Sequence, residues 1–199
     1  PLINIAEKVS YLLDNDANTI KKLHSETKMI DGNFFTHEYK PALKMIVVGA
    51  VHISQGLVSM AKTLDIDVIL VDPRTAYASE ERFPDIDFIT SWPDEALKKI
   101  GINASTAIVT LSHDPKLDDP ALEIAVRSEA FYIAALGSLK TQKERKKRLK
   151  EKGFSEDEIA RIHGPAGLDI GALEPAEIAL SILSELVATR RAENIKGIA

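Results

Sequence analysis

One stretch of the 199-residue sequence restricts the possible folds more than any other. Residues 45–48 are uninterruptedly apolar, Gly49 follows, and apolar residues then recur at helical spacing over 53–64. A second apolar run occupies 68–71. Strands that are apolar along their whole length are typical of parallel sheets, because helices cover both faces of such a sheet. The pattern therefore predicts a strand–helix–strand unit that begins at about Lys44.

The rest of the chain continues this alternation of strands and helices. The sequence predicts further strands at residues 88–90, 107–111 and 131–136. It predicts helices at 93–99, from Asp118-Asp119-Pro120 onward, at 140–152 with Gly153 as the stop, after a capping box Ser155–Glu158, and from Pro175 onward. We therefore expect an α/β fold, a Rossmann-like parallel sheet with helices on both faces.

Residues 1–43 follow a different pattern. Apolar residues recur at helical spacing over 2–13, a second short helix is predicted at 19–24, and 33–39 is predicted to be extended. This stretch is too short to bury a core of its own. We expect a small N-terminal lobe, residues 1–43, that leans on a Rossmann-like domain of residues 44–199.

Composition argues against several classes of function. The chain has no cysteine, which excludes disulfides, thiolate metal ligands and any step in which this chain carries sulfur on its own thiol. Its five histidines form no local ligand pair, so no metal site is predicted. A net charge of −5 argues against a nucleic-acid-binding surface. No apolar run approaches 18 residues, so no membrane span is predicted and a cytoplasmic location is expected.

The first candidate site is the turn that follows the first predicted strand. Dinucleotide-binding folds have the pattern G-x-G-x-x-G/A there. Gly49 matches its first position, Val51 replaces the second glycine, and Ser54 is a small third residue. Asp72 follows Gly49 by 23 positions, where an acid that binds ribose is expected. The turn favours a nucleotide-like ligand, whereas Val51 opposes close approach of a pyrophosphate; the alternative is a Rossmann scaffold with an empty or altered site.

Two later loops also carry candidate residues. His113, Asp114 and Lys116 follow the fourth strand and place an imidazole beside a carboxylate and a cation. Gly137 and Ser138 follow the fifth strand and precede a helix, whose backbone N–H groups and dipole favour a phosphate. Loops after parallel strands form the ligand crevice of such folds. The alternative is that the carboxylates after the fourth strand cap a helix and that Lys116 is only solvated.

A basic helix and a glycine-rich loop complete the candidate features. Residues 140–152 hold eight Lys or Arg and two Glu, a local charge of +6. This run predicts either a face that docks an acidic partner or an ordinary solvated face. The loop 163–172 combines His163 and Asp169 with three glycines and a proline, which permit close backbone approach to a ligand or to neighbouring backbone.

These segments, in their order, resemble one family: the XdhC/CoxI proteins, accessory factors for xanthine and carbon monoxide dehydrogenases. The resemblance extends from about Pro41 to Arg191 and corresponds to the C-terminal Rossmann domain of that family. The matching pieces are Gly49-Ala50-x-His52, Val71-Asp72-x-Arg74, Glu81-Arg82-Phe83-Pro84, the run from His113 to Leu122, Ala135 to Ser138 with Thr141, and Ile162-His163-x-Pro165-x-Gly167 to Ala172.

The resemblance implies that the chain binds molybdenum cofactor and delivers it, in sulfurated form, to the apoenzyme of a molybdenum hydroxylase. It implies a cysteine desulfurase as a second partner, and self-association as a homodimer is left open. No catalytic residue is assigned, because a maturation factor rather than a catalyst is expected. The expected cofactor-binding residues are Gly49, His52, Asp72, His113, Asp114, Lys116, Gly137, Ser138, His163 and Asp169.

An NAD(P)-binding oxidoreductase or nucleotide-sensing module is the alternative function, which Asp72 favours and Val51 opposes. Two positions depart from the family pattern, since Val51 replaces a glycine and Leu139 replaces an arginine. We expect helix N-termini at Ser138 and Asp119 to face the ligand. We also expect a single pocket to bring together His113, Asp114, Lys116, Gly137, Ser138, His163 and Asp169.

Overall fold

The computed structural model describes residues 28–30, 34–36, 42–77 and 79–195. The chain divides into two units, Pro1–Pro41 and Ala42–Ala199. In the first unit, strands β1 (Lys28–Ile30) and β2 (Phe34–Thr36) pair in antiparallel register. β2 falls within the stretch predicted to be extended, whereas the helices predicted at 2–13 and 19–24 lie outside the described residues.

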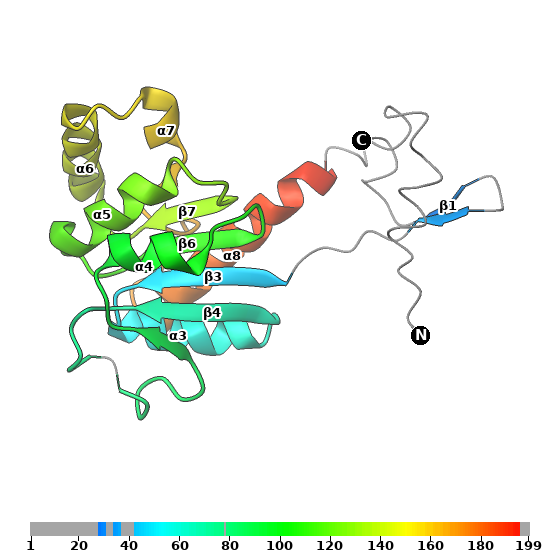
Figure 1. Ribbon diagram of the computed structural model, residues 1–199, viewed down its shortest axis with the longest axis horizontal. Coiled ribbons are helices and arrows are strands. Elements are labelled where there is room, and N and C mark those ends of the chain that lie inside the picture. The colour runs from blue at the N-terminus through cyan, green and yellow to red at the C-terminus, as the bar shows by residue number, and fades with distance from the viewer. Residues whose placement is uncertain (1–27, 31–33, 37–41, 78, 196–199) are drawn as a thin grey trace. The chain divides into compact units, whose positions relative to one another are not determined.

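The second unit is built on a six-stranded sheet (Figure 1). Its strands lie in the order β5-β4-β3-β6-β7-β8, and every neighbouring pair is parallel. This is the strand order of a Rossmann fold, so the predicted fold class is confirmed. The strand bounds are β3 (Leu43–Val48), β4 (Ile66–Val71), β5 (Asp87–Ile89), β6 (Thr106–Thr110), β7 (Tyr132–Ala135) and β8 (Ile162–His163).

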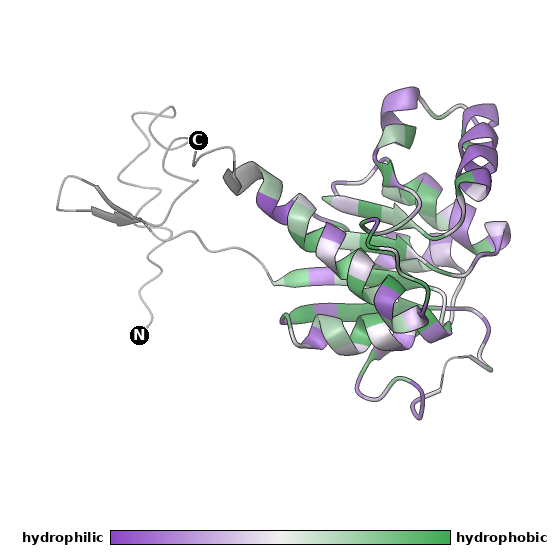
Figure 2. Cartoon of the chain, turned by 180° about the vertical axis from the view of Figure 1, so that it is seen from behind, coloured by the Kyte–Doolittle hydropathy of each residue, from purple (hydrophilic) through white to green (hydrophobic). Residues whose placement is uncertain are grey.

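Helices cover both faces of this sheet, as the all-apolar strands predict. One face is packed by α3 (His52–Lys62) and α8 (Pro175–Ile195), which contribute Leu57, Ala61, Ile182 and Leu186 to one apolar core. The other face is packed by α4 (Pro93–Ile100), α5 (Pro115–Ala125), α6 (Leu139–Glu151) and α7 (Glu156–Ala160) over a second core. Figure 2 shows the contrast between the mixed surface of α8 and the strongly polar α6. β3 and β6 lie between the two cores, and most of their side chains are fully buried.

Several predicted helix ends are present in the structure. Gly153 follows α6 with φ +86°, a conformation that glycine adopts at little cost. The capping box Ser155–Glu158 opens α7, and α8 begins at Pro175. The stop and start signals of these helices are local in the sequence, and they were sufficient to predict where the helices end or begin.

The predicted start of α5 is wrong. The helix begins at Pro115, and Asp114 caps it by accepting a hydrogen bond from the Lys116 N–H at 2.9 Å. Pro120 therefore lies inside the helix, and Asp118 and Asp119 are buried instead of capping its first turn. Pro115 and Pro120 would each suit the first turn of a helix. The helix begins at Pro115, because Asp114 just before it is the residue that caps the helix.

Candidate functional site

The loops that leave the carboxyl ends of the strands lie at one edge of the sheet (Figure 1). Gly49 follows β3, Asp72 follows β4, Ser112 follows β6 closely, and Gly137 follows β7 closely. Because all these strands are parallel, their carboxyl ends share that edge, as predicted. The strand order reverses between β3 and β6, and this is where α/β folds bind ligands.

The first turn is packed tightly against the loop after β6. Gly49 has φ +109°, and a Cβ atom built on it would lie 2.8 Å from the Ser112 backbone nitrogen. Glycine is thus required here to let two protein loops meet. His52 is the first residue of α3, exposed, with its Nδ1 3.3 Å from the Gln55 Oε1. The Val51 side chain is half-buried and packs against the core.

Asp72 is fully buried, and both oxygens of its carboxylate are engaged. Oδ2 accepts hydrogen bonds from the Ala50 N–H at 2.8 Å and the Arg74 Nη2 at 2.7 Å. Oδ1 accepts from the Arg74 backbone N–H at 2.9 Å and Nε at 2.8 Å. Burial acts to raise the pKa of Asp72, but the hydrogen bonds from Arg74 and Ala50 outweigh it and leave the pKa below its ordinary value. Asp72 therefore holds Arg74 and the first turn.

Arg74 brings to this end of the sheet a cation that was not among the expected cofactor-binding residues. Its hydrogen bonds to Asp72 raise its pKa, and the nearby charge of Asp114 adds to that effect. The guanidinium lies 4.5 Å from the centre of the exposed Tyr77 ring. Arg82 donates to the Ala50 carbonyl at 3.1 Å and closes the same turn from outside. Because the charge of Asp114 acts on Arg74, the loops after β4 and β6 lie close enough for their charges to interact.

The loop after β6 presents His113 and Lys116 to solvent. His113 has φ +60°, a left-handed conformation that is uncommon for residues other than glycine. Both residues are exposed, and neither side chain makes a hydrogen bond or ion pair with another described residue. The adjacent Asp114 caps α5, so its negative charge already lies at that helix N-terminus. These two side chains are the free polar groups of the loop.

The N-terminus of α6 is better suited to an anion than that of α5. Its cap is the neutral Ser138, whose Oγ accepts from the Thr141 N–H at 3.2 Å, and its first turn has no acidic residue. The corresponding end of α5 carries Asp114 and Asp118. A helix N-terminus acts as about half a positive charge, and a carboxylate cap offsets it. The predicted helix N-terminus at Asp119 is wrong, and the one at Ser138 is correct.

His163 contacts residues of α8 and β7. Its Nδ1 lies 3.0 Å from Glu185 Oε1, and its ring centre is 4.9 Å from that of Tyr132. Glu185 Oε2 also accepts from the Tyr132 hydroxyl at 2.7 Å and the Gly167 N–H at 2.9 Å. Burial and Glu185 raise the pKa of Tyr132, which remains a hydrogen-bond donor. The described contacts thus join His163 to Glu185 and not to His113 or Lys116.

The carboxyl edge therefore unites part of the predicted set. Contacts connect the first turn to Asp72 and to the Ser112–Asp114 loop. The buried side chains of Asp118 and Arg145 connect that loop to the segment before Gly137. His163 belongs to a separate cluster, and Asp169 is exposed with no hydrogen bond to another described residue. The sequence did not identify Arg145 or Glu185 as site residues, because their partners Asp118, Tyr132 and His163 are set by tertiary packing. Arg74 lies two residues from its partner Asp72, and its place in the matching piece with Asp72 was the signal that could have identified it.

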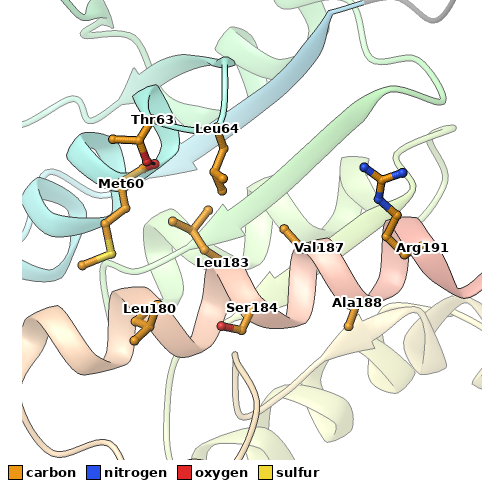
Figure 3. Close-up of a pocket in the computed structure, with 9 residues that line it drawn as sticks. All are labelled: Met60, Thr63, Leu64, Leu180, Leu183, Ser184, Val187, Ala188 and Arg191. Carbon is orange, nitrogen blue, oxygen red and sulfur yellow. Dashed lines mark hydrogen bonds between the residues drawn. The ribbon is translucent and has the colours of Figure 1, made fainter.

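A groove of about 530 Å³ lies elsewhere, between the end of α3 and α8 (Figure 3). Its lining is mostly apolar and includes Met60, Leu64, Leu183 and Val187. It contains none of the predicted site residues. Among the described residues, no three His, Asp or Glu side chains gather as metal ligands, and no helix is long and apolar enough to cross a membrane.

Comparison with known proteins gives a consistent set of relatives. A family model described as the XdhC Rossmann domain matches residues 45–186. A Bacillus subtilis (strain 168) protein, named as a probable xanthine dehydrogenase subunit, is 29% identical over 180 residues, which is 90% of this chain and 52% of that protein. The molybdenum cofactor insertion chaperone PaoD of Escherichia coli (strain K12) is 28% identical over 158 residues, 79% of this chain and 43% of PaoD.

A solved structure matches as well. The crystal structure of a xanthine dehydrogenase from Bacillus halodurans is 31% identical and superimposes with a TM-score of 0.69. The match covers 82% of this chain and 48% of that one. The chain thus spans about half the length of the curated relatives it matches.

Proposed function

The chain belongs to the XdhC Rossmann-domain family, and from this premise we propose that it binds molybdenum cofactor and inserts it into a molybdenum hydroxylase. The relative named as a molybdenum cofactor insertion chaperone supports this cargo. The relative named as a probable xanthine dehydrogenase subunit supports a xanthine dehydrogenase-type enzyme as the recipient. In this proposal the protein is a maturation factor that binds and releases its cargo and takes no catalytic part in a reaction of the recipient enzyme.

The observation that carries the proposal is the pair of adjacent loops after β6 and β7. The first presents Lys116 and His113, exposed and without partners among the described residues. The second leads into α6 through the neutral cap Ser138. A cationic side chain, an imidazole and a helix N-terminus at one sheet edge form a donor set that suits an anionic, phosphate-bearing pterin.

Each group has a separate part in the proposal. The first-turn N–H groups of α6 would donate hydrogen bonds to the phosphate end, and Lys116 would supply the full positive charge that the helix end lacks. His113 would donate or accept a hydrogen bond at the mouth of the same crevice. With no thiol in the chain, sulfur would be supplied by a cysteine desulfurase as a separate partner.

The test is cofactor retention by the intact chain. The protein is purified without oxygen from a host that makes molybdenum cofactor, and bound pterin is measured by fluorescence after oxidation. A charge-assisted hydrogen bond contributes about 1.5–3 kcal/mol, so Lys116→Ala should weaken retention roughly 10- to 150-fold. Lys99→Ala is the matched control, because Lys99 is an exposed lysine at the far end of α4. Retention that is equal in both variants, or absent from the wild type, would overturn the proposal.

An NAD(P)-dependent activity has less support from the site. A ribose hydroxyl normally binds the acid at the end of the second strand. Here the Asp72 carboxylate already accepts four hydrogen bonds from Ala50 and Arg74. A ribose would have to displace one of them, which disfavours a nicotinamide cofactor at this turn.

A further inference from the structure

A buried ion pair lies between α5 and α6, beneath the loops that leave β6 and β7. The Arg145 Nη2 is 3.5 Å from Asp118 Oδ2, and the two side chains are 3% and 1% exposed. Burial raises the pKa of Asp118 and lowers that of Arg145, and each effect is opposed by the charge of the other residue. Both charged groups are therefore shielded from water and lack the stabilisation that hydration would give them.

The acidic end of this pair holds the loop after β6. Asp118 Oδ1 accepts hydrogen bonds from the Ser112 hydroxyl at 2.6 Å and the Ser112 N–H at 3.3 Å. The Ser112 Oγ in turn accepts from the Asp114 N–H at 3.1 Å. These contacts enclose His113, the residue held in the left-handed conformation. The Asp118 side chain thus holds Ser112 directly, and through the Ser112 hydroxyl it helps to hold Asp114 on the other side of His113.

The basic end holds the segment before Gly137. Arg145 Nη2 donates to the Leu136 carbonyl at 3.1 Å, and Nη1 donates to Gln142 Oε1 at 2.6 Å. The Gln142 Nε2 donates to the Ala135 carbonyl at 2.9 Å. Two consecutive carbonyls at the end of β7 are therefore fixed by α6 side chains. This determines where the chain turns into the α6 N-terminus.

A second ion pair joins the same two helices and provides a comparison. Arg148 donates to both oxygens of Asp119, at 2.6 and 3.0 Å, and its side chain is 32% exposed. This pair has better geometry and contacts neither loop. In the first pair, by contrast, Asp118 Oδ2 and Arg145 Nε have no hydrogen-bond partner among the described residues. Buried ion pairs of that quality contribute little to stability, because desolvation offsets their attraction.

We propose that Asp118 and Arg145 are positioning residues that hold the two ligand-facing loops in one fixed arrangement. The pair does not touch the ligand; it sets the backbone of Ser112–Asp114 and Leu136–Ser138. The identity of the ligand at these loops rests on the proposed function, whereas the tie between the loops rests on the contacts alone. Loosening one end of the pair should therefore loosen both loops.

The test is amide hydrogen exchange in the intact, cofactor-free chain. Asp118→Asn should speed exchange by about tenfold or more at the hydrogen-bonded amides of Ser112 and Asp114 and also at that of Leu136, since removing one member of a buried pair leaves the other unpaired. Arg145→Lys should do the same from the opposite end. The matched controls Asp119→Asn and Arg148→Lys break the more exposed pair, which should change exchange in both loops by less than about fivefold.

Exchange of the buried β3 amides serves as the internal measure of global stability. If Asp118→Asn does not fold, Ser112→Ala provides the milder variant, because it removes the hydroxyl that donates to Asp118 and accepts from the Asp114 N–H but leaves both charges of the buried pair in place. Loosening confined to the one loop that the substituted residue contacts would overturn the proposal. Equal loosening by the control pair would also overturn it, since the ion pair would then only dock the helices.

Pterin retention separates this proposal from the proposed function. We expect Arg145→Lys to retain less pterin than Arg148→Lys when both variants are compared under conditions in which each is fully folded. A wild type without pterin would defeat the cargo assignment and leave the exchange result valid. Coupled loops with unchanged pterin retention would show that the tie is real and that it does not serve this cargo, which overturns the positioning role.

Discussion

Gly49 and Asp72 shape the first turn from opposite sides. Gly49 permits contact with Ser112, and Asp72 accepts the Ala50 N–H and the Arg74 guanidinium. A positive φ and a steric contact coincide at Gly49, whereas a hydrogen-bonded charge determines the role of Asp72. The two residues therefore respond to substitution in different ways.

Gly49→Ala should destabilise the protein more than Gly153→Ala. Both glycines have positive φ, and alanine in such conformations costs about 1–3 kcal/mol. The added Cβ meets nothing within 4 Å at Gly153 but lies 2.8 Å from backbone at Gly49. Urea denaturation of the two variants measures the difference. Equal losses would mean that the loop after β6 can move away at no cost.

Stability should fall in acid partly through Asp72. Its pKa is lowered in the folded state, so the unfolded chain binds more protons at low pH. This contribution is fully present above the ordinary pKa of 3.8 and is lost as the pH falls through the lower folded value. Asp72→Asn should therefore be less stable than wild type at pH 7, and the difference should shrink below about pH 4. A stability difference between wild type and Asp72→Asn that does not change with pH would contradict the prediction.

At the scale of elements, α6 is less available as a basic face than its composition implies. Residues 140–152 hold eight cations, and five of them form ion pairs with acidic residues of the described chain: Arg145, Lys147, Arg148, Lys150 and Lys152. Lys140, Lys143 and Lys146 form none with the described residues. Any docking of an acidic partner should therefore depend on this smaller set.

Replacing Lys143 and Lys146 by Glu should slow association with a molybdenum hydroxylase apoenzyme. Both residues are exposed and unpaired among the described residues, so the change reverses surface charge without breaking an ion pair. The effect should weaken as salt rises, because exposed charges are screened within about 8 Å at physiological ionic strength. Stopped-flow association at two salt concentrations is the measurement. A Lys98/Lys99 double reversal on α4 is the control, and equal slowing by that variant would indicate a general charge effect.

The elements themselves were predictable where their signals are local. The all-apolar runs gave the central strands, and Gly153, Ser155 and Pro175 marked helix ends within a few residues. α5 was misplaced because Pro115 and Pro120 both fit a first turn, and only tertiary packing shows that Asp118 and Asp119 face Arg145 and Arg148.

At the scale of the molecule, the core begins at Leu43. This residue is 6% exposed and pairs with Ile66 at the start of the sheet. It lies within the stretch that the sequence suggested as the N-terminal lobe. The contact division after Pro41 leaves Leu43 with the Rossmann unit.

A fragment of residues 42–199 should unfold in one cooperative transition. A fragment of residues 44–199 should be less stable by about 1.5–3 kcal/mol, the contribution of one buried leucine side chain. Urea titrations followed by circular dichroism compare both fragments with the full chain. A 42–199 fragment far less stable than the full chain would show that residues before Ala42 contribute to the core.

The sequence predicted that the site lies at the carboxyl ends of the parallel strands, but it did not predict which side chains contact one another there. Parallel topology alone placed Gly49, Asp72, Ser112 and Gly137 together. The partnership of His163 with Glu185 spans 22 positions and depends on how α8 crosses the sheet. No local motif encodes such a pairing, which is why His163 was expected to face the ligand.

The two outermost strands of the sheet have a consequence for assembly. β5 has three residues and β8 has two, so each outermost strand offers very few unpaired backbone groups to another chain. Short edge strands are one way in which proteins avoid edge-to-edge association and aggregation. If this chain forms a homodimer, its Rossmann unit should therefore pair through helix surfaces and not by extending the sheet across two molecules.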